Sequence, residues 1–217
     1  MQTLQIDGPR LPPASGTPQQ LVILLHGYGA DGNDLMGLAP YLARLLPQAY
    51  FVAPNAPEPC EMAPVGYQWF GISRFDPGER ERGAERAAPI LNAFIDRELQ
   101  RHGLSEAQLC LIGFSQGTMM ALHVGLRRER PLAGIVGFSG MLVAPEKLAD
   151  ELRQRPPILL VHGDADEVLP VQSLFEAAQG LAAAEVAAEW HVSQGTGHGI
   201  AEDGLELAAG FLRRIFR

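Results

Sequence analysis

One stretch of the chain joins an apolar run to a glycine-flanked serine: Leu109-Cys110-Leu111-Ile112-Gly113-Phe114-Ser115-Gln116-Gly117. The run Leu109–Ile112 is typical of a buried strand, and the residues after Gly117 have the spacing of a helix. A glycine two residues before Ser115 and another two after it let backbone approach where a side chain would clash. The stretch therefore predicts a strand, a tight turn and a helix, with Ser115 at the turn.

The same alternation of strand and helix continues along the chain. Apolar runs that read as buried strands are Leu21–Leu25, Ala49–Ala53, Gln108–Ile112, Leu132–Phe138, Pro157–Val161 and Val186–Val192. Helical spacing is found in Glu79–Gly103, Thr118–Leu126, Val171–Ala184 and Ala201–Phe216. Alternating strands and helices indicate βαβ units, so we expect an α/β fold with a mostly parallel central sheet and helices on both faces.

Nothing in the sequence marks a domain boundary, and we expect a single domain over residues 1–217. The proline-rich residues 1–20 predict an edge strand at most. Gly103 is expected to end the longest helix, and Pro89 to kink it or begin a new first turn. The proline-rich segment 54–69 is a long irregular loop of the kind that is usually functional.

Composition restricts the class of protein further. A mass of 23.4 kDa gives a folded surface of roughly 10,000 Å², and the net charge of −8 argues against a generic nucleic-acid binder. The two cysteines cannot form a disulfide framework. The sequence shows neither a secretory signal nor a membrane-spanning run, so we expect a cytoplasmic protein without stable membrane insertion. Its oligomeric state is open, a homodimer included.

Two glycine motifs name different enzyme classes. Residues 27–32 match the dinucleotide-binding pattern G-x-G-x-x-G, whereas residues 113–117 match G-x-S-x-G. A dinucleotide site needs an acid about 20 residues further on, and the strand there ends Phe51-Val52-Ala53-Pro54 without one. The strand-to-helix setting of Ser115 is that of the nucleophile elbow of α/β-hydrolases. We therefore expect Ser115 to be a nucleophile and no nucleotide cofactor to be bound.

A serine nucleophile needs a histidine base and an orienting acid, in the chain order serine, acid, histidine. His198 lies in a polar glycine-rich loop just past the last strand, whereas His191 would be held within that strand, so His198 is the expected base. The strand Pro157–Val161 leads into three candidate acids, and spacing does not choose among Asp164, Asp166 and Glu167. The histidines lack metal-ligand spacing, and we expect no metal.

Four motifs together resemble a known family. They are Leu25–Gly32, Gly113–Gly117, His162-Gly163-x-x-Asp166-x-Val168-Leu169-Pro170 and Gly197-His198. In this order they are similar to the carboxylesterase/acyl-protein thioesterase family, the phospholipase/carboxylesterase group of α/β-hydrolases. The chain looks like a small bacterial member, and the similarity runs from about Gln20 to the end. It implies an α/β-hydrolase fold and ester hydrolysis without a cofactor.

The resemblance also implies roles for individual residues. Carried over to this chain, Asp166 is the acid of the triad, and the backbone amides of Tyr28 and Gln116 form the oxyanion hole. Gln68-Trp69-Phe70 resembles the family's aromatic segment beside the acyl pocket. Where the family commonly has leucine this chain has Tyr28, which leaves the backbone donor in place and changes the shape of the adjoining pocket.

We therefore expect a serine hydrolase that cleaves small esters or thioesters with short-to-medium acyl chains through an acyl-serine intermediate. Its expected pocket walls are Met62, Trp69, Phe70, Met119 and Val168, with ordinary core packing as the alternative for Met119 and Val168. Alternative activities are acyl-protein thioesterase or lysophospholipase action on longer chains, and lactone hydrolysis or haloperoxidase-like chemistry with the same triad. A non-catalytic ligand-binding protein of the same fold is the alternative from another class.

Overall fold

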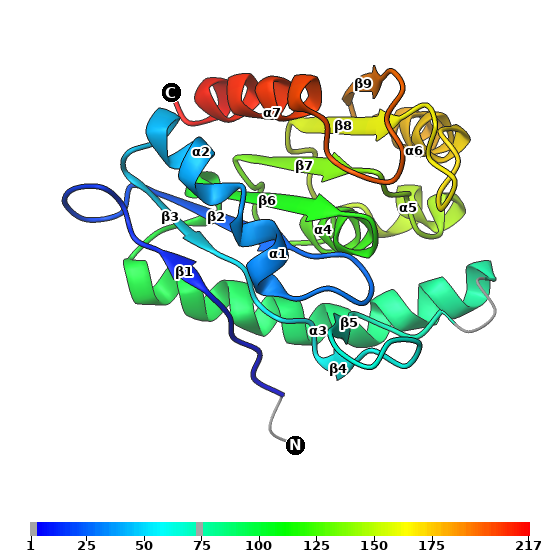
Figure 1. Ribbon diagram of the computed structural model, residues 1–217, viewed down its shortest axis with the longest axis horizontal. Helices are drawn as coiled ribbons and strands as arrows, with labels where there is room; N and C mark the ends of the chain where they lie inside the picture. The colour runs from blue at the N-terminus through cyan, green and yellow to red at the C-terminus, as the bar shows by residue number, and fades with distance from the viewer. Residues whose placement is uncertain (1–3, 73–75) are drawn as a thin grey trace.

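The computed structural model describes residues 4–72 and 76–217, and within them the main sheet has seven strands in the order β1-β3-β2-β6-β7-β8-β9 (Figure 1). They are β1 Arg10–Leu11, β2 Gln20–Leu25, β3 Ala49–Val52, β6 Leu109–Phe114, β7 Gly134–Phe138, β8 Ile158–Gly163 and β9 Glu189–Ser193. Neighbouring strands are parallel except β1, which pairs antiparallel with β3. The prediction of a mostly parallel sheet is confirmed. Residues 1–3 of the N-terminal segment lie outside the described residues, and of its described residues before β2 only those of β1 join the sheet.

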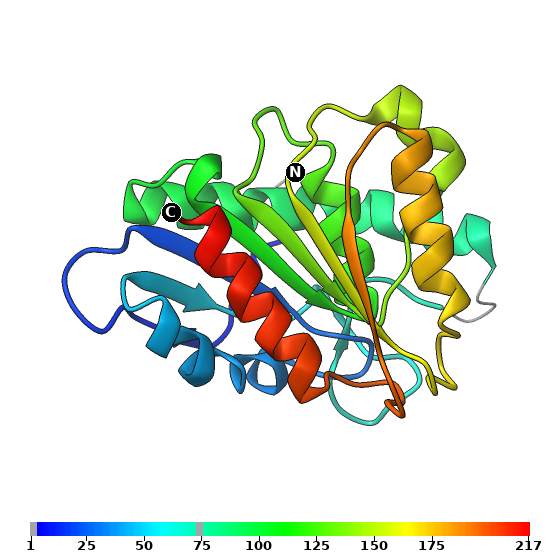
Figure 2. The same ribbon diagram turned by 90° about the horizontal axis from the view of Figure 1, so that it is seen from above.

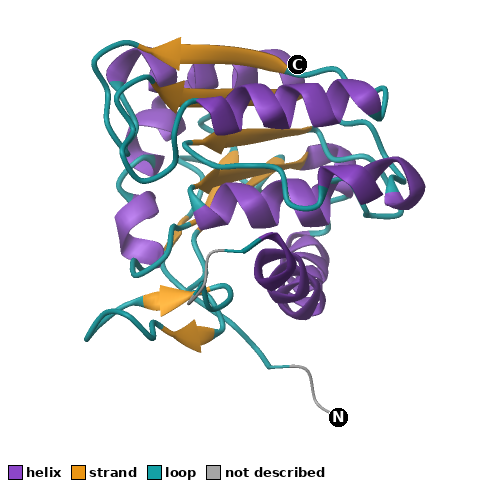
Figure 3. Ribbon diagram, turned by 90° about the vertical axis from the view of Figure 1, so that its right-hand side faces the viewer, coloured by secondary structure: helices purple, strands orange, loops and turns teal. Residues whose placement is uncertain are grey.

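Helices cover both faces of this sheet, as predicted (Figure 2). One face is packed by α1 Gly32–Met36, α2 Ala39–Leu45 and α7 Glu202–Ile215. The other is packed by α3 Pro77–His102, α4 Gln116–Gly125, α5 Pro145–Glu151 and α6 Gln172–Ala183. A separate small sheet, formed by β4 Glu58–Pro59 and β5 Tyr67–Gln68, lies beside the main one (Figure 3), and a short 3₁₀ turn, Glu106–Gln108, leads into β6.

Burial explains why the strands read as unbroken apolar runs. Leu21–Leu25 of β2 are fully buried because a parallel strand with helices on both faces has no solvent side. The accessible surface is 10035 Å², which agrees with the value expected from the mass. No helix within the described residues combines the length and the apolar character that crossing a membrane requires.

The long helix α3 follows its predicted pattern. It buries Ala87, Leu91, Phe94 and Ile95 against the sheet and continues through Pro89 without starting a new helix. Gly103 ends it in the left-handed region, with φ at 64°, and the N–H groups of Gly103 and Leu104 donate to carbonyls of the last turn. The predicted glycine cap is confirmed.

The start of the last strand was predicted wrongly. The prediction began at Val186, whereas β9 begins at Glu189. Glu185 has φ at 57°, and the N–H of Val186 donates to the Leu181 carbonyl at 2.9 Å, which is the bonding pattern of a Schellman helix end. Val186 is therefore buried as part of the cap of α6. The short helices α1, α2 and α5 were not predicted.

Two glycine-to-alanine changes should alter stability in opposite directions. Gly103→Ala places a side chain in the left-handed region and should lower the free energy of unfolding by about 1 kcal/mol. Gly210→Ala lies at an exposed position of helix α7, where an added Cβ meets nothing within 4 Å, and should raise the free energy of unfolding by about 0.5–1 kcal/mol. Urea unfolding of both variants measures this. Changes of equal sign would contradict the assigned backbone conformations.

Candidate active site

Ser115 occupies a strained turn between β6 and α4. Its φ of 53° and ψ of −116° lie outside the regions that a serine prefers. A Cβ on Gly113 would lie 2.4 Å from the Gly117 carbonyl oxygen, and one on Gly117 would lie 1.8 Å from the Leu25 oxygen. The close backbone approach predicted from the two glycines is therefore confirmed, and with it the strand–turn–helix geometry.

Asp166 and His198 contact each other across two loops. The Nδ1 of His198 lies 2.7 Å from the Oδ2 of Asp166, and the other carboxylate oxygen accepts hydrogen bonds from the N–H groups of Val168 (2.9 Å) and Leu169 (2.8 Å). Burial of the Asp166 carboxylate opposes its ionisation. The bonds from His198, Leu169 and Val168 outweigh this and hold its pKa below the usual range. Asp166 is therefore ionised at neutral pH.

This contact also decides which nitrogen of His198 carries a proton. An ionised carboxylate only accepts, so Nδ1 donates to Asp166, and in the neutral ring Nε2 is left with a free lone pair. The imidazole lies 4.9 Å, centroid to centroid, from the ring of Phe114, the residue before Ser115. Across the described residues, Ser115 Oγ makes no hydrogen bond to His198. Such catalytic bonds are often long before substrate binds.

The other candidate acids lie elsewhere. Asp164 accepts from the N–H of Gly195 at 2.6 Å and so fastens the loop that carries His198, while Glu167 is exposed. Of the three acids that spacing left open, Asp166 is the one in contact with His198. The loop that carries His198 is also held by Ser139, whose backbone lies in the left-handed region with φ at 45°. The Ser139 hydroxyl donates to the Gly199 carbonyl at 3.2 Å.

His191, the alternative base, has another partner. Its Nε2 lies 2.8 Å from the carboxylate of Asp203, which also accepts from the hydroxyl of Ser193 at 2.8 Å. Hydrogen bonds from His191 and Ser193 lower the pKa of Asp203. These contacts join β9 to the start of α7 and close the base of the loop that holds His198.

Within residues 4–72 and 76–217, no group of three or more His, Cys, Asp or Glu side chains could hold a metal ion.

The glycine loop 27–32 is held against the serine turn. His26 anchors it: Nε2 accepts from the N–H of Ala56 at 2.9 Å, so Nδ1 donates to the Gly27 carbonyl at 2.7 Å, and burial lowers the pKa of this ring. A Cβ on Gly27 would lie 3.3 Å from the Ser115 Cβ. In the described part of the chain, the backbone N–H groups of Tyr28 and Gln116 donate to no other group. They are free donors in the segments that flank Ser115.

The side chain of Gln116 has a structural role that the sequence did not indicate. It is buried, its Oε1 accepts from the N–H of Trp69 at 2.8 Å, and its Nε2 donates to the Phe70 carbonyl at 2.7 Å. The residue after the serine thus ties the aromatic segment to the turn. A buried glutamine must find partners for both ends of its amide, and this requirement is the signal that could have pointed to the contact.

The five expected pocket residues lie in two kinds of surroundings. Trp69, Phe70 and Met119 are buried members of the hydrophobic core. Met62 and Val168 are exposed, at 76% and 61%. Core packing accounts for the burial of the first three, and the role of all five in binding an acyl group stays a prediction.

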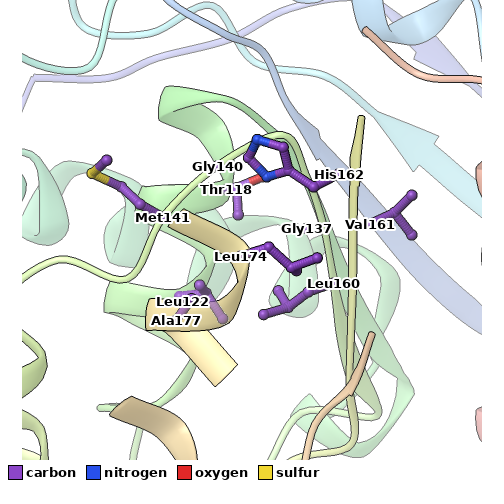
Figure 4. Close-up of a pocket in the computed structure, with 10 residues that line it drawn as sticks. All are labelled: Thr118, Leu122, Gly137, Gly140, Met141, Leu160, Val161, His162, Leu174 and Ala177. Carbon is purple, nitrogen blue, oxygen red and sulfur yellow. The ribbon is translucent and has the colours of Figure 1, made fainter. Parts of the chain in front are cut away.

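Two hollows lie near the candidate site. An open pocket of about 370 Å³ beside His198 was not predicted, and it is lined by Asp34, Leu35, Leu38, Phe114, His198, Gly199 and Ile200. A second cavity lies beside strands β7 and β8. Its lining includes Thr118, Met141 and His162 (Figure 4). At about 10 Å³ it has space for about one water molecule and none for an acyl chain.

A parallel sheet with these loops at the ends of its strands is the fold of the α/β-hydrolases, as expected. The chain belongs to the phospholipase/carboxylesterase family, whose model matches residues 8–216, and it is a hydrolase.

Individual relatives agree with the family. Acyl-protein thioesterase 1 of Saccharomyces cerevisiae is 31% identical over 90% of this chain and 92% of the yeast protein. Esterase YpfH of Escherichia coli is 26% identical over 90% of this chain and 82% of its own length. The crystal structure of esterase PE8 superposes with a TM-score of 0.94 at 48% identity, covering 97% of this chain and 99% of that one.

The lowered pKa of Asp166 predicts how stability depends on pH. A carboxyl whose pKa falls on folding stabilises the protein fully above its unfolded value, near 4, and this stabilisation is lost as pH falls through the folded pKa. Asp166→Asn lacks the titrating group. Below about pH 5 the difference in the free energy of unfolding between wild type and variant should narrow as the pH falls. Urea unfolding across this range measures it, and a difference that does not narrow would contradict the assignment.

Proposed function

We propose that this hydrolase cleaves carboxylic esters and thioesters through an acyl-serine intermediate, with Ser115 as nucleophile, His198 as base and Asp166 as the acid that orients it. The observation that carries the proposal is the 2.7 Å bond between Asp166 and His198 Nδ1. It leaves Nε2 able to accept a proton, in a loop whose imidazole lies against the residue preceding Ser115.

The chemistry follows from these groups. The Ser115 oxygen attacks the carbonyl carbon while its proton passes to His198 Nε2, and Asp166 stabilises the imidazolium that forms. The oxygen of the tetrahedral intermediate accepts from the free amides of Tyr28 and Gln116, and each such donor is worth about 10²–10³ in rate. The bond to the leaving alcohol or thiol then breaks, the leaving group takes the proton from Nε2, and water hydrolyses the acyl-serine.

The relatives support both substrate classes, since one carries the name of a thioesterase and another that of an esterase. For the acyl group we propose a short-to-medium chain, because the segment 54–69 is the main cover that a chain of this size offers. This segment is not the wholly irregular loop that the sequence predicted, since it contains the paired strands β4 and β5. Action on longer chains, as an acyl-protein thioesterase or a lysophospholipase, is the alternative activity. We propose a cytoplasmic location as well.

Replacing the nucleophile tests the mechanism. Ser115→Ala should lower kcat for p-nitrophenyl acetate by at least about 10³-fold and abolish any pre-steady-state burst of p-nitrophenol, because no acyl-enzyme can form. Ser15→Ala is the matched control, since Ser15 is an exposed serine in the N-terminal segment, away from the candidate site. It should still turn over through an acyl-enzyme. Full activity in Ser115→Ala would contradict the proposal.

A series of p-nitrophenyl esters from acetyl to palmitoyl tests the acyl preference. With a constant leaving group, kcat/KM should be highest at a chain of fewer than about twelve carbons, because the chain offers little cover for a longer one. Steady-state kinetics below the solubility limit of each ester give this profile. A maximum at twelve carbons or more would favour the long-chain alternative.

A further inference from the structure

The open pocket beside His198 has no role in the mechanism above. Its walls come from three places. Helix α1 provides Asp34 and Leu35, and the link between α1 and α2 provides Leu38. Strand β6 provides Phe114, and the loop before α7 provides Ile200 next to His198 and Gly199. The pocket therefore brings together three separate segments of the chain, one of which carries His198. Its volume of about 370 Å³ lies at the lower end of the range for small-molecule sites.

The direction of proton transfer says which part of a substrate this pocket faces. During acylation the carbonyl carbon becomes bonded to the Ser115 oxygen, and the carbonyl oxygen faces the amides of Tyr28 and Gln116. The bond that breaks joins the carbon to the leaving oxygen or sulfur, and that atom takes the proton from His198 Nε2. The leaving group must therefore lie against the imidazole of His198, which is one of the residues that line the pocket.

The lining of the pocket says which leaving groups fit. Leu35, Leu38, Ile200 and Phe114 offer apolar contact, and no Lys or Arg is among the lining residues. Asp34 is exposed and supplies a negative charge at the wall. Asp31 lies one turn earlier, where its side chain caps α1 by accepting from the N–H of Asn33 at 2.8 Å. Charge at this site therefore attracts cations and repels anions.

We propose that this pocket is the leaving-group subsite and that it selects small alcohols or thiols with an apolar body and a neutral or positively charged head over anionic ones. This inference rests on the proposed function, because it uses His198 as the acid that protonates the leaving group. It makes Asp34 a specificity-determining residue and Leu38 and Ile200 the walls that limit leaving-group size.

The charge preference is tested with two acetate esters of the same shape. Acetylcholine carries a quaternary nitrogen where 3,3-dimethylbutyl acetate carries a carbon. The wild type should favour acetylcholine in kcat/KM by about two- to fivefold, as expected for a partly solvated charge pair. Asp34→Asn should bring the ratio to about one, while Asp150→Asn, an exposed acid on α5, should keep it. A wild-type ratio of one, or a ratio that Asp34→Asn does not change, would overturn the charge assignment.

The size preference is tested by filling the pocket. In Leu38→Trp, or in Ile200→Phe from the opposite wall, kcat/KM for cyclohexyl acetate relative to methyl acetate should fall about tenfold. The ratio between methyl octanoate and methyl acetate should stay as in the wild type. A change in this second ratio instead of the first would show that the pocket holds the acyl chain, and would overturn the proposal.

The same assays distinguish failure of the proposed function from failure of the leaving-group subsite alone. If Ser115→Ala turned over methyl acetate as fast as the wild type, the proposed function itself would fail. If turnover depends on Ser115 and the leaving-group ratios are unchanged in Asp34→Asn, Leu38→Trp and Ile200→Phe, only the subsite is rejected.

Discussion

The first turn of α4 touches the end of β2, and the rest of the site depends on this contact. At Gly117 the two backbones come so close that a Cβ would lie 1.8 Å from the Leu25 carbonyl oxygen. The contact fixes α4 directly above the sheet, so Ser115 is held in a conformation that serine avoids. It also brings the amide of Gln116 beside the glycine loop that starts after β2. A side chain at position 117 would force the helix away and separate Ser115 and the Gln116 amide from the Tyr28 amide in the loop after β2.

The loops after β8 and β9 carry Asp166 and His198, and side-chain hydrogen bonds hold these loops in place. Asp164 binds Gly195 and Ser139 binds Gly199, while Asp203 joins β9 to α7 at the base of the loop. The imidazole of His198 therefore does not depend on Asp166 alone for its position. Buried backbone contacts therefore place Ser115, and side-chain hydrogen bonds place the loop that carries His198.

How far the sequence predicts this site depends on how local each feature is. The Ser115 turn and the His198 loop could be predicted because glycines and a strand pattern lie within a few residues of each. The choice of Asp166 over Asp164 and Glu167 could not be made from spacing, since only the folded loop decides which carboxylate turns inward to the amides of Val168 and Leu169; the family resemblance supplied it. Val186 has the composition of a strand and serves as a helix cap. The pocket beside His198 joins segments about 80 residues apart, which no local pattern reveals.

The proposed mechanism requires Ser115, His198 and the two amides to act on a single tetrahedral centre. A crystal structure of the protein after reaction with a p-nitrophenyl alkylphosphonate ester tests it most directly, because the adduct mimics that centre. We predict phosphorus bonded to Ser115 Oγ, with one phosphonyl oxygen about 2.7–3.1 Å from the backbone nitrogens of Tyr28 and Gln116. The alkoxy oxygen should lie within hydrogen-bond reach of His198 Nε2. An adduct on another residue, or a phosphonyl oxygen turned away from both amides, would contradict it.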